Sequence, residues 1–518
     1  MIFDVKIESF CRKARLVAGD NATETPKCMT YSSVVSRESV RIALTFASLN
    51  ELEVKAGDVE NAYITAPITE KVWTILGAEF GADAGKRAII VRALYGLRSA
   101  GAAFRGHLAD MMRVIGYVPC MADQDLWMKE EVKPITGEKY WSYVLNYVDD
   151  VLVIHHDSMS ILNRIGKFFK LKDDPNNGEP NMYLGAKLKK RALNNGVEAW
   201  TLSPSKYVQE AVQNCKKHLK AHLPKYSMPK SAPNPFVMGY VPELDDSRLL
   251  DATSANYFQS LIGVLRWCIE IGRIDLCTEV SLLSAYLAAP REGHLIAALN
   301  VMSYLGQKHN TRLTFDPTYP EIDYEVFNYD KPWIDFYGDV KEPVPLNAPE
   351  ARGKAIDLRA FVDSDHAGEK TTRRSRTGYL IYLNNSLITW FSKRQPTVEC
   401  SVFGAKFVAM KHVMEDLRGL RYKLRMMGVP VPGPSFVLGD NQSVIFNTSR
   451  PESTLKKKSN SICYHAVREA VAMGEMLTGH VPSKLNLADL LTKVLFGSLR
   501  RTLVGRIVED IFDFLPSQ

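Results

Sequence analysis

The stretch Tyr143-Val144-Leu145-Asn146-Tyr147-Val148-Asp149-Asp150-Val151-Leu152-Val153-Ile154 decides the fold of the first half of the chain. It is apolar except for Asn146 and two adjacent acids, a pattern that predicts a strand, a tight turn and a second strand. An Asp-Asp turn is often only structural, because aspartate is common in turns. Two neighbouring acids between buried strands repel each other, however, and a bound cation relieves that repulsion.

A third acid is expected to join this pair. Leu52, Val54 and Ala56 recur at every second position, as in a strand, and lead to Asp58 on the same face. Three carboxylates at strand ends and a turn are suitable ligands for two Mg²⁺ ions about 3.5–4 Å apart. Such a pair of ions activates a 3′-hydroxyl and stabilises the leaving pyrophosphate in nucleotidyl transfer.

Length and composition set the class of protein. A chain of 518 residues with 46% hydrophobic and 24% charged residues predicts a globular protein of about three domains. The sequence has no apolar run of about 18 residues and no apolar segment behind its first residues, so we expect neither a membrane partner nor secretion. The net charge of +7 is compatible with a nucleic-acid partner but does not require one.

The spacing of the eight cysteines argues against a zinc site and favours free thiols. They form no C-x-x-C pair, so a zinc ribbon, knuckle or finger is not expected. Without a secretory signal, the sequence favours buried, reduced thiols.

The C-terminal part predicts a second α/β unit. One strand ends at Asp363, a hairpin turns at Asn384-Asn385, and a further strand leads to Asp440. A long helix is expected between them, with its apolar side chains on one stripe. These are Phe403, Phe407, Met410, Met414, Leu417, Leu420 and Leu424. Residues 250–306 are expected to be all-helical.

Several ordered blocks resemble one family over nearly the whole chain. Tyr147-Val148-Asp149-Asp150 resembles the active-site box of reverse transcriptases, and the segment 57–63 resembles their first polymerase motif. The segments 12–18 and 93–97 are similar to blocks of copia-type LTR retrotransposon polyproteins. Further similar blocks are Tyr183-Leu184-Gly185, Ser260-Leu261-Ile262-Gly263 and Arg273-Ile274-Asp275.

The resemblance implies an α+β and α/β multidomain fold. This is a right-hand polymerase with fingers, palm and thumb, followed by a ribonuclease H-like α/β domain. The expected organisation is fingers and palm, thumb and helical connection, linker, ribonuclease H-like domain and C-terminal tail, at residues 1–190, 191–306, 307–355, 356–500 and 501–518. Because only about ten residues precede the block at 12–18, we expect fingers truncated at the N-terminus, in a polyprotein fragment or a decayed remnant.

For the polymerase, the resemblance assigns metal binding and catalysis to Asp58, Asp149 and Asp150. Lys13 and Arg15 would hold the incoming triphosphate, although they also fit an ordinary basic strand face. Tyr63 would lie beneath the deoxyribose, although an aromatic residue here also fits a core position. The lysine-rich stretch 167–191 would contact primer–template phosphates, or form a solvated face. The implied cofactor is Mg²⁺, with Mn²⁺ as an alternative.

A second trio of acids follows from three further motifs. Segments 361–368, 439–442 and 487–493 resemble ribonuclease H motifs of copia-type elements. Asp363, Asp440 and Asp489 would be the catalytic and metal-binding residues of phosphodiester hydrolysis. Each of them could instead be a helix cap or a turn residue.

One departure from the family pattern concerns this second site. Lys406, in the block Ala405-Lys406-Phe407-Val408-Ala409, stands where relatives carry a glutamate. The change removes a metal ligand and adds a cation, and neither Glu399 nor Glu415 is placed to compensate. We therefore expect weak or absent ribonuclease H activity.

The expected function is that of an RNA-directed DNA polymerase. Its partners would be an RNA template, a DNA primer, the RNA·DNA hybrid and dNTPs, and the family implies cytoplasmic virus-like particles and then the nucleus. The alternative is a non-catalytic retroelement remnant that at most binds nucleic acid. An unrelated metal-dependent nuclease would leave the polymerase blocks unexplained. The oligomeric state and the natural template stay open.

Overall fold

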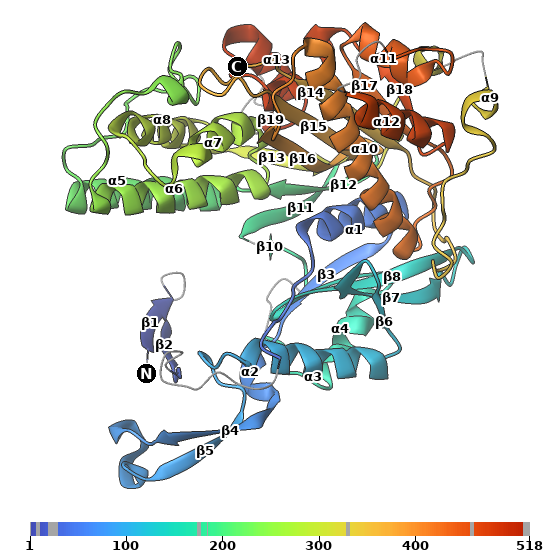
Figure 1. The fold of residues 1–518 in the computed structure, drawn as a ribbon. Helices are drawn as coiled ribbons and strands as arrows, with labels where there is room; N and C mark the ends of the chain where they lie inside the picture. The colour runs from blue at the N-terminus through green and yellow to red at the C-terminus, as the bar shows by residue number, and fades with distance from the viewer. Residues whose placement is uncertain are drawn as a thin grey trace, which may run out of the picture. The chain divides into compact units, whose positions relative to one another are not determined.

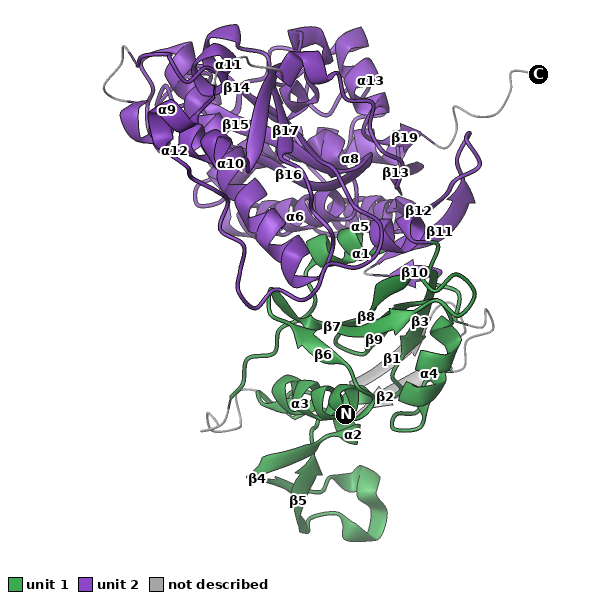
Figure 2. Ribbon diagram, turned by 90° about the vertical axis from the view of Figure 1, so that its right-hand side faces the viewer, with its two compact units in different colours: residues 1–43, 51–180 green, residues 44–50, 181–518 purple. Residues whose placement is uncertain are grey.

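The computed structural model describes residues 2–6, 11–18, 29–172, 178–183, 185–327, 332–455 and 460–510, with the backbone alone at 2–6 and 11–15. The elements form a mixed α/β structure (Figure 1), which confirms the predicted fold class. The chain divides into two compact units (Figure 2). One comprises residues 1–43 and 51–180, and the other comprises residues 44–50 and 181–518. The domain boundaries inferred from the sequence stay a prediction.

The first unit is built on a five-stranded antiparallel sheet with the strand order β3-β9-β8-β7-β6. The strands are β3 (Glu53–Asp58), β6 (Val118–Cys120), β7 (Asp123–Val132), β8 (Lys139–Tyr147) and β9 (Asp150–His155). β8, the turn at 148–149 and β9 are the predicted strand, turn and strand. The acids at this turn therefore lie at the end of the sheet's central hairpin.

Helices α3 (Ala100–Val114) and α4 (Ser158–Gly166) pack on one face of this sheet. α3 contributes Phe104, Leu108 and Met112 to the shared core, where they meet side chains of β8 and β9. Gly116 follows the helix with a φ of 87°, which glycine adopts without steric cost. This part of the chain also forms the helices α1 (Arg37–Leu49), α2 (Ala62–Thr65) and η2 (Ala78–Asp83). Two further pairs of antiparallel strands are β1 (Ile2–Lys6) with β2 (Cys11–Arg15), and β4 (Pro67–Ile75) with β5 (Arg87–Arg92).

The second unit contains two five-stranded sheets. The first has the order β10-β11-β12-β13-β19, with β10 (Met182–Tyr183), β11 (Ala186–Ala192), β12 (Glu198–Ser203), β13 (Thr311–Phe315) and β19 (Glu509–Asp510). The predicted helical region holds α6 (Ala252–Glu270), η4 (Ile274–Leu276), α7 (Cys277–Leu283), η5 (Ser284–Tyr286) and α8 (Glu292–Gln307). α5 (Ser205–His222) and η3 (Pro242–Leu244) precede them, and α5 packs against α8.

The second sheet has the order β16-β15-β14-β17-β18. Its strands are β14 (Leu358–Ser364), β15 (Arg376–Leu383), β16 (Ser386–Arg394), β17 (Ser435–Gly439) and β18 (Met476–His480). β14, β15 and β16 are antiparallel, and β17 and β18 run parallel to β14. The hairpin turns at Asn384, with a φ of 52°, as the Asn-Asn signal predicts.

Helices flank this second sheet. They are α10 (Val402–Met426), α11 (Gln442–Ser449) and α12 (Ser461–Ala472), and α10 packs on β14 and β15. The predicted apolar stripe of α10 is buried, apart from Phe403, which is half-buried. The short elements η8 (Ser483–Leu485) and η9 (Leu487–Leu491) then bring the chain back to β14 and β15.

Two stretches are more ordered than the sequence suggests. β13 lies inside the stretch expected as a linker, and that stretch also holds η6 (Tyr324–Phe327) and α9 (Ile334–Tyr337). The expected C-terminal tail completes α13 (Gly497–Gly505) and adds β19 to the edge of β13. The reason is a combination of burial and charge: Ile507 and Val508 are buried, while Glu509 pairs with Arg191 and Arg312 at 2.9 and 2.8 Å.

The cysteines follow the expectation in part. Of the six that the structure describes with their side chains, all are unpaired thiols and four are buried. Cys400 is exposed and Cys463 is half-buried, so burial is not general. Within the described residues, no helix combines the length and the apolar character needed to cross a membrane.

Candidate active sites

The polymerase acids meet at the end of the hairpin β8–β9. Asp58 ends β3 and lies directly opposite Asp150, the first residue of β9. Asp149 lies in the turn, where its carbonyl oxygen accepts a hydrogen bond from the Val59 amide at 2.9 Å. Val148 precedes it with a φ of 58°. That left-handed conformation is unfavourable for a β-branched residue, and such strain is typical of functional turns.

The charges of this cluster are only partly balanced. Burial raises the pKa of Asp150 to about 6, with further contributions from Asp149 and Asp58, against the opposing effect of Lys172. Oδ2 of Asp58 is paired with Nζ of Lys172, whose backbone amide also donates to the Asp58 carbonyl at 2.9 Å. Oδ1 of Asp58 is buried and has no hydrogen-bond partner among the described residues. A divalent cation would satisfy that oxygen and relieve the repulsion, so these residues fit a metal ion.

Tyr63 lies next to this cluster, on the short helix α2. Its ring centroid is 4.9 Å from that of Tyr95 and 6.2 Å from that of Phe104. Burial raises the pKa of its hydroxyl, and the nearby charge of Asp149 raises it further. Tyr63 therefore lies near Asp149 and also contacts aromatic side chains, and its predicted role beneath the deoxyribose stays a prediction. Lys13 and Arg15 belong to β2, but their side chains lie outside the described residues.

Three lysines of the lysine-rich stretch form partly exposed ion pairs with acids of the chain, and its contact with phosphates stays a prediction. Lys170 pairs with Glu60 at 2.7 Å, Lys172 pairs with Asp58, and Lys190 pairs with Glu198. These lysines therefore have acidic partners within the chain. Lys172 is the member that sequence reasoning missed as a site residue, because its acid partner is distant in the sequence.

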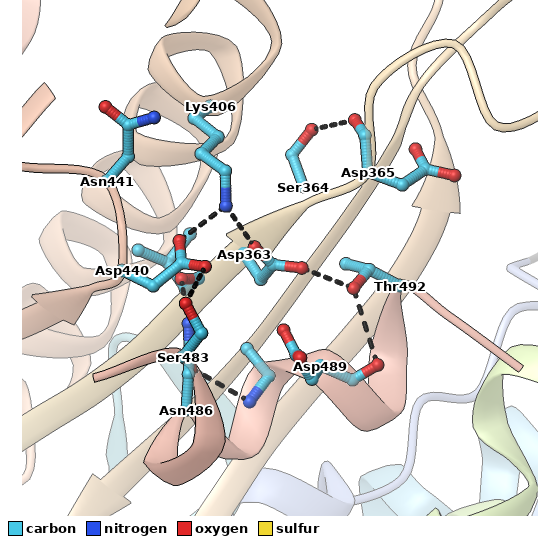
Figure 3. Close-up of polar contacts among 12 residues, drawn as sticks. Asp363, Ser364, Asp365, Lys406, Asp440, Asn441, Ser483, Asn486, Asp489 and Thr492 are labelled. Carbon is cyan, nitrogen blue, oxygen red and sulfur yellow. Dashed lines mark hydrogen bonds and ion pairs between the residues drawn. The ribbon is translucent and has the colours of Figure 1, made fainter. Parts of the chain in front are cut away.

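The second trio of acids comes from three different elements. Asp363 lies near the end of β14, Asp440 follows β17, and Asp489 lies in η9. Figure 3 shows the three side chains pointing toward one another. One carboxylate oxygen from each lies within 4.8 Å of the others, and among the described residues this is the one acidic, histidine or cysteine trio that meets such a spacing. The predicted residues thus converge, in a geometry compatible with a metal ion.

Two lysines, Lys406 and Lys493, pair with these acids, and Figure 3 shows Lys406 between Asp363 and Asp440. Nζ of Lys406 lies 2.6 Å from Oδ1 of Asp363 and is also paired with Oδ1 of Asp440. Nζ of Lys493 lies 2.9 Å from Oδ1 of Asp489 and 3.4 Å from Oδ2 of Asp363. Asp363 thereby has an ammonium group on each of its two oxygens. Sequence reasoning identified Lys406 but not Lys493, although Lys493 is the last residue of the motif quoted for Asp489.

Hydroxyl groups complete the polar network. Thr492 donates from Oγ1 to Oδ2 of Asp363 at 2.5 Å, and Ser483 donates from Oγ to Oδ2 of Asp440 at 3.1 Å. Glu399 and Glu415 lie elsewhere, since Glu399 accepts from Asn460 at 3.0 Å and Glu415 pairs with Lys411 at 2.7 Å. Neither glutamate replaces the ligand that is missing at position 406.

Burial and charge act in opposite directions on these acids. Burial alone would raise the pKa of Asp363, but Lys406 and Lys493 outweigh it and hold that pKa at about 2. Burial raises the pKa of Asp489 to about 6, and the neighbouring negative charge of Asp363 adds to the shift. The most buried acid of the trio is therefore neutralised by lysines of the chain itself.

Comparison with known proteins agrees with the motifs. Residues 3–222 match the sequence profile of the family described as "Reverse transcriptase (RNA-dependent DNA polymerase)". The retrovirus-related Pol polyprotein from transposon RE1 of Arabidopsis thaliana is 25% identical over 93% of this chain and 29% of its own length. The corresponding polyprotein from transposon TNT 1-94 of Nicotiana tabacum is 24% identical over 95% of this chain and 34% of its own length. The chain thus spans about a third of these relatives.

Two solved structures are also similar. A foamy viral protease–reverse transcriptase, solved with an RNA/DNA hybrid, is 11% identical with a TM-score of 0.26, over 86% of this chain and 68% of that one. An N-terminal ribonuclease H domain from Mycobacterium tuberculosis is 13% identical with a TM-score of 0.22, over 27% of this chain and 91% of that one. The sequence matches thus show similarity to reverse transcriptases at residues 3–222, and similarity to retrovirus-related Pol polyproteins of copia-type transposons over most of the chain.

Proposed function

We propose that this chain is an RNA-directed DNA polymerase that uses Asp58, Asp149 and Asp150 as its metal-binding carboxylates. The observation that carries the proposal is their meeting at the strained β8–β9 turn, within the segment that matches reverse transcriptases. The raised pKa of Asp150 and the unpartnered Oδ1 of Asp58 support a bound cation. When bound, Mg²⁺ would favour deprotonation of the primer 3′-hydroxyl and stabilise the leaving pyrophosphate.

The chain's own residues would have three tasks at this site. Asp149 and Asp150 would present their oxygens from the turn, and Asp58 would add its free oxygen from the facing strand. Lys172 neutralises the other oxygen of Asp58 and would be exchanged for the metal or for a substrate phosphate. Tyr63, packed on Tyr95 beside Asp149, would lie beneath the deoxyribose and exclude a 2′-hydroxyl by its bulk. Lys13 and Arg15 would hold the triphosphate.

We further propose that the ribonuclease H-like domain binds an RNA·DNA hybrid without cutting it efficiently. Lys406, at the position where the family resemblance leads us to expect a glutamate, bridges Asp363 and Asp440, and Lys493 neutralises the other side of Asp363. A divalent ion would have to displace two ammonium groups to reach these oxygens. The acids fit a metal ion by spacing, but the lysines lower the net negative charge that would attract one.

Primer extension on poly(rA)·oligo(dT) with Mg²⁺ tests the polymerase. The expected result is incorporation of dTTP that depends on Mg²⁺ and disappears in Asp149→Asn. Hybrid binding by both proteins, measured in parallel, separates a catalytic defect from a folding defect. If the folded wild-type chain binds the hybrid but extends no primer, the polymerase proposal fails.

A non-catalytic remnant is the second candidate, and the lysines favour it. Lys172 and Lys406 each pair with an acid that catalysis needs. A remnant would bind hybrid with the same affinity with or without Mg²⁺ and would extend nothing. Extension that depends on Asp149 would exclude it.

A further inference from the structure

A cavity of about 430 Å³ lies between the two sheets of the second unit, away from the acids. Its apolar lining includes Leu193, Leu313 and Ile507 from the side of the first sheet, and Leu387 and Leu487 from the other side. Among its polar lining residues are the cations Arg359 and Arg506 and the hydroxyl-bearing Tyr382. Arg359 and Tyr382 lie directly opposite each other on β14 and β15.

Arg359 is a largely buried cation without an acidic partner. Its Nη2 donates to Oδ1 of Asn385 at 3.2 Å, while its Nε is buried and, among the described residues, makes no hydrogen bond. Its Cζ lies 5.5 Å from the ring centroids of Phe361 and Tyr382, so the guanidinium lies against two aromatic rings. Burial lowers the pKa of Arg359. An unpaired charge in such surroundings is unfavourable unless an anion accompanies it.

The acids that line the cavity are engaged elsewhere. Glu509 pairs with Arg191 and Arg312 and accepts from Thr314 at 2.8 Å. Asp316 accepts from the backbone amide of Thr318 at 2.9 Å and from its hydroxyl at 2.7 Å. Neither carboxylate therefore serves as the counterion of Arg359.

Tyr382 adds a second unused donor. Its side chain is only 5% exposed, and within the described part of the chain its hydroxyl has no hydrogen-bond partner. A buried hydroxyl without a partner is costly and rare in native proteins. Arg359 and Tyr382 together therefore offer two unsatisfied hydrogen-bond donors and a positive charge to one apolar cavity.

We propose that this cavity binds a small molecule that carries an oxyanion, carboxylate or phosphate, on an apolar body. Nε of Arg359 and the Tyr382 hydroxyl would donate to the oxyanion, and the leucine side chains would cover the apolar part. The site is distinct from both acid clusters and does not depend on the proposed polymerase activity. It shares β14 with Asp363, which lies on the same face four residues further along the strand.

Calorimetric titration of the full chain tests the ligand class with three probes. Benzoate and phenyl phosphate carry the two oxyanions on one apolar ring, and benzamide is the neutral counterpart of benzoate. Saturable binding of at least one anion, with benzamide at least about tenfold weaker, is expected because the hydrogen bonds go to a charged group. Whichever anion binds more tightly identifies the head group. No saturable binding of either anion, or equal binding of benzamide, would overturn the proposal.

Two variants locate the site. Arg359→Met should weaken binding by at least about tenfold and raise the thermal midpoint without ligand, because an unpaired buried charge is replaced by an apolar side chain. Tyr382→Phe removes one unpartnered hydroxyl, so it should fold normally and bind a few-fold more weakly. Arg501→Met, at an exposed arginine outside the cavity, is the matched control and should change neither quantity.

The variants can also refute the inference. If Arg359 has only a structural role, Arg359→Met lowers the thermal midpoint and the anions do not stabilise the wild type. If Arg359→Met does not fold, Tyr382→Phe still decides, because unchanged anion affinity in that variant would contradict a ligand at this hydroxyl. Equal loss in Arg501→Met would indicate nonspecific binding and would also contradict the assignment.

Discussion

The two acid clusters of this chain are built from the same residue type and balanced in different ways. At the polymerase turn, one oxygen of Asp58 is buried without a partner and burial raises the pKa of Asp150 to about 6. At the ribonuclease H-like site, Lys406 and Lys493 hold the pKa of Asp363 at about 2. The negative charge of the first cluster is therefore only partly balanced, whereas Lys406 and Lys493 balance most of the negative charge of the second cluster.

The different charge balance of the two clusters means that converging carboxylates do not by themselves indicate an active metal site. The second trio is the more compact of the two, with its oxygens within 4.8 Å, yet it has two ammonium neighbours. Net charge around the acids separates the two clusters better than their spacing does.

Loss of a turn acid should have the largest effect. Asp150→Asn removes a proposed metal ligand, which is worth several kcal/mol of transition-state stabilisation, so the rate of primer extension should fall about a thousandfold. Steady-state extension measures this. The matched control is Glu415→Gln at an exposed position of α10, which should extend primers at the wild-type rate. A decrease of less than about tenfold in Asp150→Asn would contradict the assignment of the polymerase site.

Loss of the bridging lysine should destabilise the second unit. Lys406→Gln leaves Asp363 and Asp440 without their shared ammonium group, so unfolding in urea without Mg²⁺ should become easier by about 3 kcal/mol. Added Mg²⁺ should restore part of this stability by taking the place of the lysine. Lys411→Gln on the same helix breaks only a partly exposed pair with Glu415 and should cost less than about 1 kcal/mol. Equal effects of the two variants would mean that Lys406 is no special counterion.

The two clusters should respond oppositely to pH. The pKa of Asp363 is lower in the fold than in the unfolded chain, so its contribution is present above about pH 4 and is lost as pH falls toward 2. The pKa of Asp150 is higher in the fold, so without metal its ionisation destabilises the protein as pH rises from about 4 to about 6.

At pH 7 without Mg²⁺, Asp363→Asn should therefore lower the free energy of unfolding by about 2 kcal/mol, and Asp150→Asn should raise it by about 2 kcal/mol. Urea unfolding of each variant across pH 3 to 8 measures both slopes. The same sign of change in the two variants would contradict the contrast between the clusters.

The smallest effect is expected at Lys172. Its pair with Asp58 is more than a third exposed on both sides, so Lys172→Gln should change stability by less than about 1 kcal/mol. Because the variant frees Oδ2 of Asp58, its affinity for Mg²⁺ should rise a few-fold, which calorimetry can follow. Weaker Mg²⁺ binding in this variant would show that Lys172 does not compete with the metal.

Much of this fold could be predicted because strong local signals coincide with it. The apolar run around Asp149 and Asp150 predicted the first hairpin, the apolar stripe from Phe403 to Leu424 predicted α10, and Asn384 marked the second hairpin. Composition and periodicity did not predict the strands that form only by pairing with distant parts of the chain. β13 and β19 are short strands in stretches without periodicity, and they form because each pairs with an edge distant in the sequence.

At the candidate sites too, local motifs predicted some of the residues, while others could be identified only from the fold. Strand ends and motifs identified the acids, and the departure at Lys406 was visible as a substitution in a known block. The partners of these acids were not visible, because Lys172 reaches Asp58 across 114 positions and Lys493 reaches Asp363 across more. The unpaired Arg359 had no sequence signal, because an arginine without an acid is recognisable only from its surroundings.

One assay tests the central claim that the first cluster is active and the second is neutralised. A hybrid with one label on the DNA primer and another on the RNA template is incubated with the wild-type chain, dNTPs and Mg²⁺, and both strands are followed on one gel. We predict that the primer is extended while the RNA template stays intact. Cleavage of the RNA by the wild type that disappears in Asp440→Asn, or an unextended primer on bound hybrid, would contradict the account.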